Sequence, residues 1–298
     1  RRFDGFRTMT LLELLATSHT FFIILAVLLG LMVGSFLNVV IYRLPLMMER
    51  GWRSQCAELL GQPNPDAEKP ALTLWGPRSR CPQCGHLITA IENIPLLSYA
   101  VQRGRCAHCR APIGIQYPLV EALSGCLAGI VAWKLGFGWP AGAALIFTWI
   151  LLAASAIDFR HQLLPDDLIL PLLWLGLLAA LFGLYTDLPS AVIGAMAGYL
   201  SLWSVYQVFR LLTGKEGMGH GDFKLLAALG AWTGWQYLVT IVILSSLVGA
   251  AIGLALVLFR GRDRHIPMPF GPFLAAAGWI ALLWGEPVNQ TYLRWLGL

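Results

Sequence analysis

The sequence predicts an all-α polytopic membrane protein with about eight transmembrane helices and one long polar loop. Of its 298 residues, 57% are hydrophobic and only 12% are charged, whereas soluble domains carry about 25% charged residues. Apolar runs long enough to cross a bilayer, which takes about 20 helical residues, recur along the chain. We assign the net charge of +5 to loops that set membrane topology, so we expect membrane lipid, and no nucleic acid, as a partner.

The apolar runs divide the chain into four parts. Residues 1–8 precede Met9, and we expect them to be a scar or an upstream extension without a fold role. Residues 9–43 form the first transmembrane segment, and residues 116–298 a multi-helix transmembrane domain. Residues 44–115 lie between them as a polar loop domain. The apolar runs themselves cover about 21–42, 117–135, 140–157, 166–184, 188–211, 224–236, 237–259 and 270–285.

The first apolar run ends in a stretch of small and polar residues. Gly34 and Ser35 are small, which favours close helix packing in lipid. Asn38 is polar inside the span. We expect it to make an interhelical hydrogen bond, with a direct catalytic role as the alternative.

Positive charge sets the orientation of the predicted spans. The polar loop at residues 44–115 is rich in arginine, and basic loops stay on the cytoplasmic side of a membrane. With this loop inside, 16 of the 21 Lys and Arg residues face the cytoplasm, and both chain ends face outward. The same topology places Asp158 and Asp222 at the cytoplasmic rim.

Four cysteines in the polar loop have metal-ligand spacing. Two C-x-x-C pairs, Cys81 with Cys84 and Cys106 with Cys109, stand 21 residues apart. Each pair makes a tight turn that directs two thiolates at one point, and two such turns build a tetrahedral zinc site. The loop is therefore predicted to be a small zinc-ribbon-like domain. Four protein ligands leave no open position, so the Zn²⁺ is structural.

Other uses of the cysteines are less consistent with the sequence. A disulfide is the alternative for the two pairs, but the cytoplasm keeps thiols reduced. Cys56 and Cys126 have no partner at a useful spacing, so we expect buried, inert thiols. Between the pairs, the segment that begins with Glu92 and Asn93 mixes polar and apolar residues. It either packs the loop onto the membrane domain or binds a ligand.

Two aspartates border apolar runs far apart in the sequence. Asp222 follows Gly219 and Gly221, and glycine lets another backbone approach closely. Asp158 also ends an apolar run, without an evident capping duty. Two carboxylates that share a site hold one proton between them. One then takes a proton from water while the other donates to a scissile carbonyl, which is the chemistry of aspartyl proteolysis.

Structural roles for these carboxylates remain as alternatives. Asp158 has Arg160 and Lys224 as candidate ion-pair partners, and Asp222 has Lys224. Asp166 follows a proline and precedes the next apolar run, so we expect it to be a helix N-cap. No serine or cysteine nucleophile motif competes with the aspartates.

With these residues in view, the sequence resembles the type IV prepilin peptidases, which are G-x-G-D aspartyl membrane proteases with an N-methyltransferase activity. The resemblance covers nearly the whole chain from about residue 9. One departure is Ile91, where many members carry Trp. The motifs that carry the resemblance are Gly34–Val39, the two cysteine pairs, Glu92–Leu96, Tyr117–Glu121, Ile157–Asp158 with Leu164–Asp166, and Gly219–Lys224.

The resemblance implies a function and a site. Asp158 and Asp222 match the family's catalytic pair, which cleaves prepilins and pseudopilins after a glycine on the cytoplasmic face of the bacterial inner membrane. The new N-terminal residue, usually Phe, is then methylated from S-adenosylmethionine. The sequence has no glycine-rich strand-to-helix loop of a soluble methyltransferase. We therefore expect the donor site where the cysteine loop meets the membrane domain, at Glu92, Asn93 and Gly104.

Two other functions remain as alternatives. A general G-x-G-D intramembrane protease without methylation would share the aspartates, but the cysteine loop argues against it. A transporter or assembly scaffold, which is not an enzyme, would place charges near the bilayer midplane in broken helices. The predicted spans contain few charges, and Asp158 and Asp222 are predicted at the rim.

Overall fold

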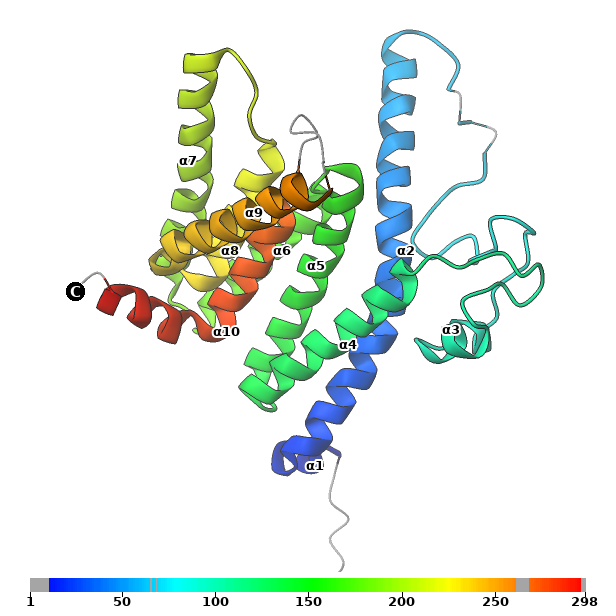
Figure 1. Ribbon diagram of the computed structural model, residues 1–298, viewed down its shortest axis with the longest axis horizontal. Helices are drawn as coiled ribbons and strands as arrows, with labels where there is room; N and C mark the ends of the chain where they lie inside the picture. The colour runs from blue at the N-terminus through cyan, green and yellow to red at the C-terminus, as the bar shows by residue number, and fades with distance from the viewer. Residues whose placement is uncertain (1–10, 65, 68, 261–267, 296–298) are drawn as a thin grey trace, which may run out of the picture. The chain divides into compact units, whose positions relative to one another are not determined.

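The structure is a computed structural model that describes residues 11–64, 66–67, 69–260 and 268–295 (Figure 1). The expectation for residues 1–8 lies outside the described residues. Over the described ranges the regular structure is helical, and the only β-bridge joins Arg105 to Pro112 in isolation. The all-α prediction is therefore confirmed.

Each of the eight predicted apolar runs corresponds to one helix, and shorter helices lie in the loops. The helices are α1 (Leu11–Thr17), α2 (His19–Leu59), η1 (Ile91–Asn93), α3 (Leu97–Val101), α4 (Gln116–Leu135), α5 (Trp139–His161), α6 (Asp166–Leu181), α7 (Leu188–Thr213), α8 (His220–Thr233), η2 (Trp235–Tyr237), α9 (Leu238–Arg260) and α10 (Gly271–Trp295).

Fewer helices than predicted are long and apolar enough to span a membrane. Among the described residues five qualify, namely α2, α4, α5, α7 and the stretch Trp235–Leu258, which covers η2 and most of α9. Helices α6 and α8 have only 16 and 14 residues, and a perpendicular span needs about 20. Helix α10 is kinked at Trp284, where the backbone is not helical. The count of about eight spans is therefore not confirmed.

Helix α2 continues well past the predicted end of the first span. It includes Pro45 and ends at Leu59, although proline removes a backbone donor. An ion pair one turn apart, between Glu49 and Arg53, supports the extension. The guanidinium of Arg43 is buried and donates to the carbonyls of Thr73 and Pro77. These bonds tie the following loop to the helix.

The described chain forms two compact units, and the first contains the cysteine loop. This unit combines residues 11–36 with residues 81–149. Within it α2 and α4 pack closely, because a Cβ on Gly34 would lie 2.8 Å from the Cα of Glu121. The Ser124 hydroxyl donates to the Gly30 carbonyl across the same contact, at 2.5 Å. The close packing predicted at Gly34 is confirmed.

The second unit, residues 37–80 and 150–295, contains the two aspartates. Helix α8 is its centre and packs against α6, α7 and α10 (Figure 1). Every residue from Phe223 to Thr233 is buried except Lys224, as expected of a helix that is apolar all round. Helices α7 and α8 meet at Gly194 and Gly230, where a Cβ on either glycine would collide with the carbonyl oxygen of the other.

Candidate functional site

Asp158 lies in the last turn of α5 and is almost fully buried, with 6% of its surface exposed. Its Oδ2 accepts a hydrogen bond of 3.0 Å from the backbone N–H of Gly271, the first residue of α10. Over the described residues, no ion pair joins Asp158 to Arg160 or Lys224. A buried carboxylate without a cation is costly, and in a membrane protein such a group is a candidate for a functional site.

Asp222 lies in the first turn of α8 and is 8% exposed. The preceding Gly219 has an extended backbone and no side chain to cap the helix, so the helix begins with open N–H groups and a partial positive charge. Close by, the ring of His220 contacts those of Tyr206 and Phe223, with centroids 5.2 and 5.4 Å away. The aromatic cluster fixes the start of α8, and with it the position of Asp222.

The fold places the two aspartates in the same unit. They are close enough for the charge of Asp158 to act on Asp222. Leu164, in the loop between α5 and α6, lies beside Gly221, which precedes Asp222, and beside Gly271, which contacts Asp158. A Cβ on Gly221 would be 2.8 Å from Leu164 Cβ, and a Cβ on Gly271 would be 3.2 Å from Leu164 Cδ1. Glycines at these positions let the segments that carry the aspartates come together.

Lys224 does not pair with either of these aspartates. Its Nζ lies 2.8 Å from both carboxylate oxygens of Asp166, so the alternative ion pairs with Lys224 are not formed. The N-cap role predicted for Asp166 is wrong. Pro165 occupies the N-cap of α6 without a side-chain cap, and Asp166 is the first helical residue. Its carboxylate is turned to the lysine instead.

The four cysteines of the loop converge as their spacing predicts. The sulfur atoms of Cys81, Cys84, Cys106 and Cys109 all lie within 4.8 Å of one another, and those of Cys81 and Cys109 are 3.7 Å apart. Tetrahedral zinc with Zn–S bonds of about 2.3 Å needs sulfurs about 3.8 Å apart. The cluster therefore fits a metal ion, and none of its cysteines is in a disulfide.

The two cysteine turns have the same backbone pattern. In the first, Gly85 donates to the carbonyl of Cys81, and Cys81 donates to that of His86. In the second, Arg110 donates to Cys106, and Cys106 donates to Ala111. The residue four positions after the first cysteine has positive φ in both turns, +72° at Gly85 and +61° at Arg110. The repeated geometry is typical of paired zinc turns.

The thiols of the cluster differ in acidity. The backbone N–H groups of Cys84 and Gln83 lower the pKa of Cys81 to about 6. The backbone N–H of His86 also favours the Cys84 thiolate, but burial and the neighbouring sulfurs outweigh it and raise the pKa of Cys84 to about 12. Four crowded sulfurs therefore do not all ionise by themselves. A divalent cation between them would stabilise all four thiolates.

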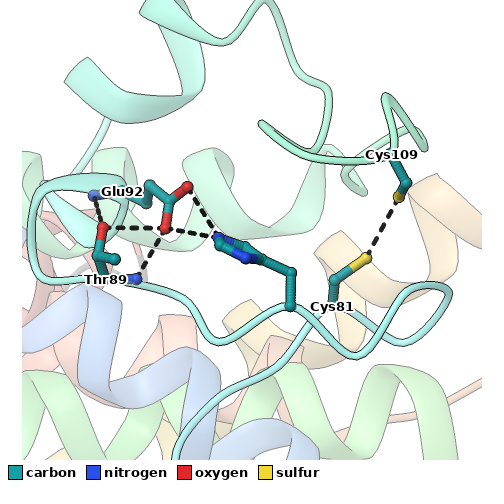
Figure 2. A network of polar contacts seen from close by, with 5 residues as sticks. Cys81, Thr89, Glu92 and Cys109 are labelled. Atoms are coloured by element: carbon teal, nitrogen blue, oxygen red, sulfur yellow. Dashed lines mark hydrogen bonds and ion pairs between the residues drawn. The ribbon is translucent and has the colours of Figure 1, made fainter.

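The carboxylate of Glu92 is hydrogen-bonded to other residues of the loop. Its carboxylate accepts the backbone N–H and the hydroxyl of Thr89 at 2.8 and 2.9 Å, and lies 3.2 Å from the ring of His86 (Figure 2). The Thr89 N–H, the Thr89 hydroxyl and His86 together lower the pKa of Glu92. Because His86 follows Cys84 and closes the first cysteine turn, Glu92 connects that turn to the segment at η1.

The other two residues predicted for the methyl donor also have internal contacts. Asn93 Oδ1 accepts the hydroxyl of Ser35, at 3.3 Å. Gly104 has a φ of +68°, and a Cβ there would lie 2.9 Å from the hydroxyl of Tyr99. All three residues therefore shape the loop, and their assignment to the donor stays a prediction.

Some features of these sites were not predicted. The buried carboxylate of Glu121 accepts the N–H of Leu96, at 2.9 Å, where the Leu96 backbone has a φ of +59°. This bond fastens the segment after η1 to α4. The hydrogen bond from Gly271 to Asp158 was also missed. Its one signal in the sequence is a glycine directly before a proline, at a helix start.

Two further cysteine predictions were wrong. Cys56 and Cys126 are exposed, not buried. Cys56 lies in the extension of α2 beyond the predicted span, and Cys126 lies within α4. Neither belongs to the cluster.

Comparison with known proteins identifies the family. The model of the bacterial peptidase A24 N-terminal domain matches residues 28–135, and that of the type IV leader peptidase family matches residues 145–254. The chain belongs to the type IV leader peptidase family. The second match contains both Asp158 and Asp222, and the first contains the four cysteines. No solved structure matches the chain.

Curated members of the type IV leader peptidase family cover nearly the whole chain. A protein of Pseudomonas aeruginosa is 56% identical over 97% of this chain and 99% of its own length. Relatives from Stutzerimonas stutzeri and Aeromonas hydrophila are both 55% identical and cover 97% and 95% of this chain, and 100% and 98% of their own lengths. All three are named prepilin leader peptidase/N-methyltransferase.

Proposed function

We propose that this chain is a bifunctional membrane enzyme that removes the leader peptides of type IV prepilins and pseudopilins after a glycine and methylates the new N-terminal residue. The observation that carries the proposal is the similarity to prepilin leader peptidase/N-methyltransferases over 97% of the chain at 56% identity. The buried aspartates within the matched peptidase region supply a chemistry for the cleavage.

Asp158 and Asp222 are the proposed catalytic pair. One carboxylate is ionised and removes a proton from a water molecule, whose oxygen attacks the carbonyl carbon of the scissile bond. The other carboxyl donates its proton toward the carbonyl oxygen. When the tetrahedral intermediate collapses, the C–N bond breaks and the leaving amine takes the proton that the first carboxylate removed from water, while the hydroxyl on the former carbonyl oxygen returns its proton to the second carboxylate. Two observations support this role, since each carboxylate lies at a helix end and is shielded from bulk water.

The cysteine loop is proposed to serve the second reaction. S-Adenosylmethionine supplies the methyl group when it is bound. Methyl transfer requires the free amine and the donor to be held in line, so a loop of fixed shape is needed. Glu92 and Asn93 hold the η1 segment through Thr89, His86 and Ser35. Gly104 allows the turn that packs on a tyrosine. We propose that these residues form the donor site by shaping this segment.

The proposed metal follows from the four cysteines, and the proposed location follows from the apolar spans and the basic loop. The proposed ion is Zn²⁺, held by Cys81, Cys84, Cys106 and Cys109 with no open position. Its role is structural, since four sulfurs complete the coordination. The chain is a membrane protein with several apolar spans. We propose the inner membrane, with the aspartates and the basic loop on the cytoplasmic side, because positive loops remain inside.

Cleavage of a synthetic prepilin peptide in detergent tests the proposal. Asp158→Asn and Asp222→Asn are expected to lower the cleavage rate by at least about 100-fold, the low end of what loss of general acid–base catalysis costs. The amide introduced by Asp158→Asn keeps an oxygen that can accept the Gly271 N–H, so the fold should persist.

The matched control for these variants is Asp167→Asn, which alters an exposed carboxylate in the first turn of α6 and should cleave normally. Full cleavage by either catalytic variant would rule out the aspartyl mechanism. An intact peptide with the unaltered protein would instead favour a scaffold.

A further inference from the structure

The N-terminus of α10 uses a catalytic carboxylate to complete its hydrogen bonds. A helix begins with N–H groups that have no partner inside the helix. In α10, Phe273 and Leu274 donate to the carbonyl of Phe270, and Pro272 has no N–H to donate. The N–H of Gly271 donates to Asp158 Oδ2, at 3.0 Å. Asp158 on α5 is therefore connected directly to the start of a helix more than 100 residues later.

The absence of a side chain at Gly271 is required for this contact. A Cβ there would lie 2.6 Å from Asp158 Oδ2, 3.2 Å from Asp158 Cγ and 3.2 Å from Leu164 Cδ1. A real Cβ does not come this close to a carboxylate oxygen, and Leu164 prevents movement to the other side. Any larger residue at position 271 would therefore displace the Asp158 carboxylate. The φ of Gly271 is not positive, so the glycine is needed for space.

The two aspartates differ in the hydrogen-bond donors that reach their carboxylates. Asp158 has a fixed backbone donor, whereas no donor from the described part of the chain reaches the carboxylate of Asp222 at hydrogen-bond distance. A hydrogen bond to one oxygen fixes the rotation of a carboxylate and directs its second oxygen. Asp158 is thus oriented before substrate arrives, and hydrogen bonds of this kind to a charged group are among the stronger ones.

We propose that Gly271 is a positioning residue for the cleavage reaction, which holds Asp158 through its N–H and through its missing side chain. The proposal rests on the proposed function, because it assumes that Asp158 is one of the two catalytic carboxylates. A purely structural role is the competing explanation, in which Asp158 only caps α10. The two differ in what is lost when the N–H is removed, namely turnover or the fold.

An ester at residue 271 isolates the N–H. Incorporating glycolic acid in place of Gly271 by nonsense suppression replaces the N–H with oxygen and adds no Cβ. The expected result is a fall in kcat for cleavage of at least about tenfold, the lower end of what a hydrogen bond to a charged group contributes, with KM within about twofold. Methylation of a pre-cleaved peptide that starts with Phe should stay within about twofold.

Alanine variants test the requirement for space. Gly271→Ala should lower kcat further than the ester does, because it displaces Asp158 as well as crowding Leu164. Gly278→Ala is the matched control, since its Cβ would also be crowded, by the Leu229 side chain on α8, but away from both aspartates. Thermal unfolding in detergent measures the effect on the fold, and the ester decides the question if Gly271→Ala does not fold.

The outcomes separate this proposal from the proposed function. An unchanged kcat in the ester variant, a change in KM alone, or equal losses of cleavage and methylation would each overturn the role of Gly271. If Asp158→Asn itself cleaves normally, the proposed aspartyl mechanism has failed instead.

Discussion

The cysteine loop and the aspartate-bearing helices hold their acidic groups in opposite ways. In the loop, Glu92 has three protein contacts and a lowered pKa. In the helical unit, Asp158 has a single backbone donor and Asp222 has none among the described residues, although both are buried. A carboxylate that is fully engaged at a surface stabilises a loop. A buried carboxylate with free oxygens is available for chemistry.

The two regions also differ in what holds them together. The cysteine loop has little buried apolar surface, and its fixed points are the cysteine cluster and turns with positive φ. The helical unit is held by glycine contacts between helices and by a buried α8. Damage to one region should therefore leave the other folded.

The helical unit should be most sensitive where α7 and α8 touch. Gly230→Ala is expected to destabilise it by about 3 kcal/mol or more, because the new methyl group meets the Gly194 backbone, which cannot move aside as a side chain can. Thermal unfolding in detergent measures the loss. Gly253→Ala in α9 is the control, since the nearest atom, Met268 Cε, is 3.5 Å away. Equal unfolding temperatures for the two variants would show that the glycine contact does not hold these helices together.

The cysteine loop should depend on its metal. Cys81→Ser is expected to reduce bound zinc from about one ion per chain to a small fraction of that and to expose the loop to protease, because a structural site needs all four ligands. The unfolding temperature of the helices should change little. Elemental analysis and limited proteolysis provide the measurements, with Cys56→Ser as the control outside the cluster. Zinc retained at the wild-type level in Cys81→Ser would exclude the proposed site.

Glu92 should have a smaller effect, which depends on pH. Glu92→Gln keeps an acceptor but removes the charge, so methylation is expected to fall several-fold while cleavage stays within about twofold. Since folding lowers the pKa of Glu92 below 4.5, its stabilising contribution is present above pH 4.5 and is lost as pH falls through the folded value.

Hydrogen exchange of the loop should therefore differ between Glu92→Gln and wild type at pH 7, and the difference should shrink as the pH falls below 4.5. Glu58→Gln, an exposed glutamate outside the cysteine turns, serves as the control. A difference that grows on acidification would mean that the sign of the effect is wrong.

The pair between Lys224 and Asp166 should matter least. Their side chains are 34% and 51% exposed, and such pairs contribute about 0.2–1 kcal/mol, less in salt. Lys224→Ala should therefore shift the unfolding temperature slightly and leave cleavage unchanged. If it abolished cleavage, Lys224 would have to act with the aspartates, although the structure pairs it with Asp166.

Local sequence patterns predicted the features that depend on the type of a residue and on its spacing along the chain. The two C-x-x-C turns predicted the cluster of four sulfurs. Polar residues that border apolar runs predicted Asp158 and Asp222 as a pair, and both are buried in the same unit, while their catalytic role stays a prediction. The helices followed from apolar runs, but the number of spans did not, because α6 and α8 are short and apolar core helices look like spans. The hydrogen bond from Gly271 to Asp158 and that from Leu96 to Glu121 join distant segments. No local pattern predicts the partners in these two bonds, since they depend on how helices pack.

Measuring both reactions in Asp222→Asn distinguishes the roles of the two regions. If buried aspartates cleave while the cysteine loop shapes the methylation site, Asp222→Asn should fail to cleave a prepilin peptide. It should still methylate a pre-cleaved peptide that starts with Phe at close to the wild-type rate, with its zinc content and unfolding temperature unchanged. A folded Asp222→Asn that cleaves, or one that cannot methylate the pre-cleaved peptide while Glu92→Ala can, would show that the two reactions are not divided in this way.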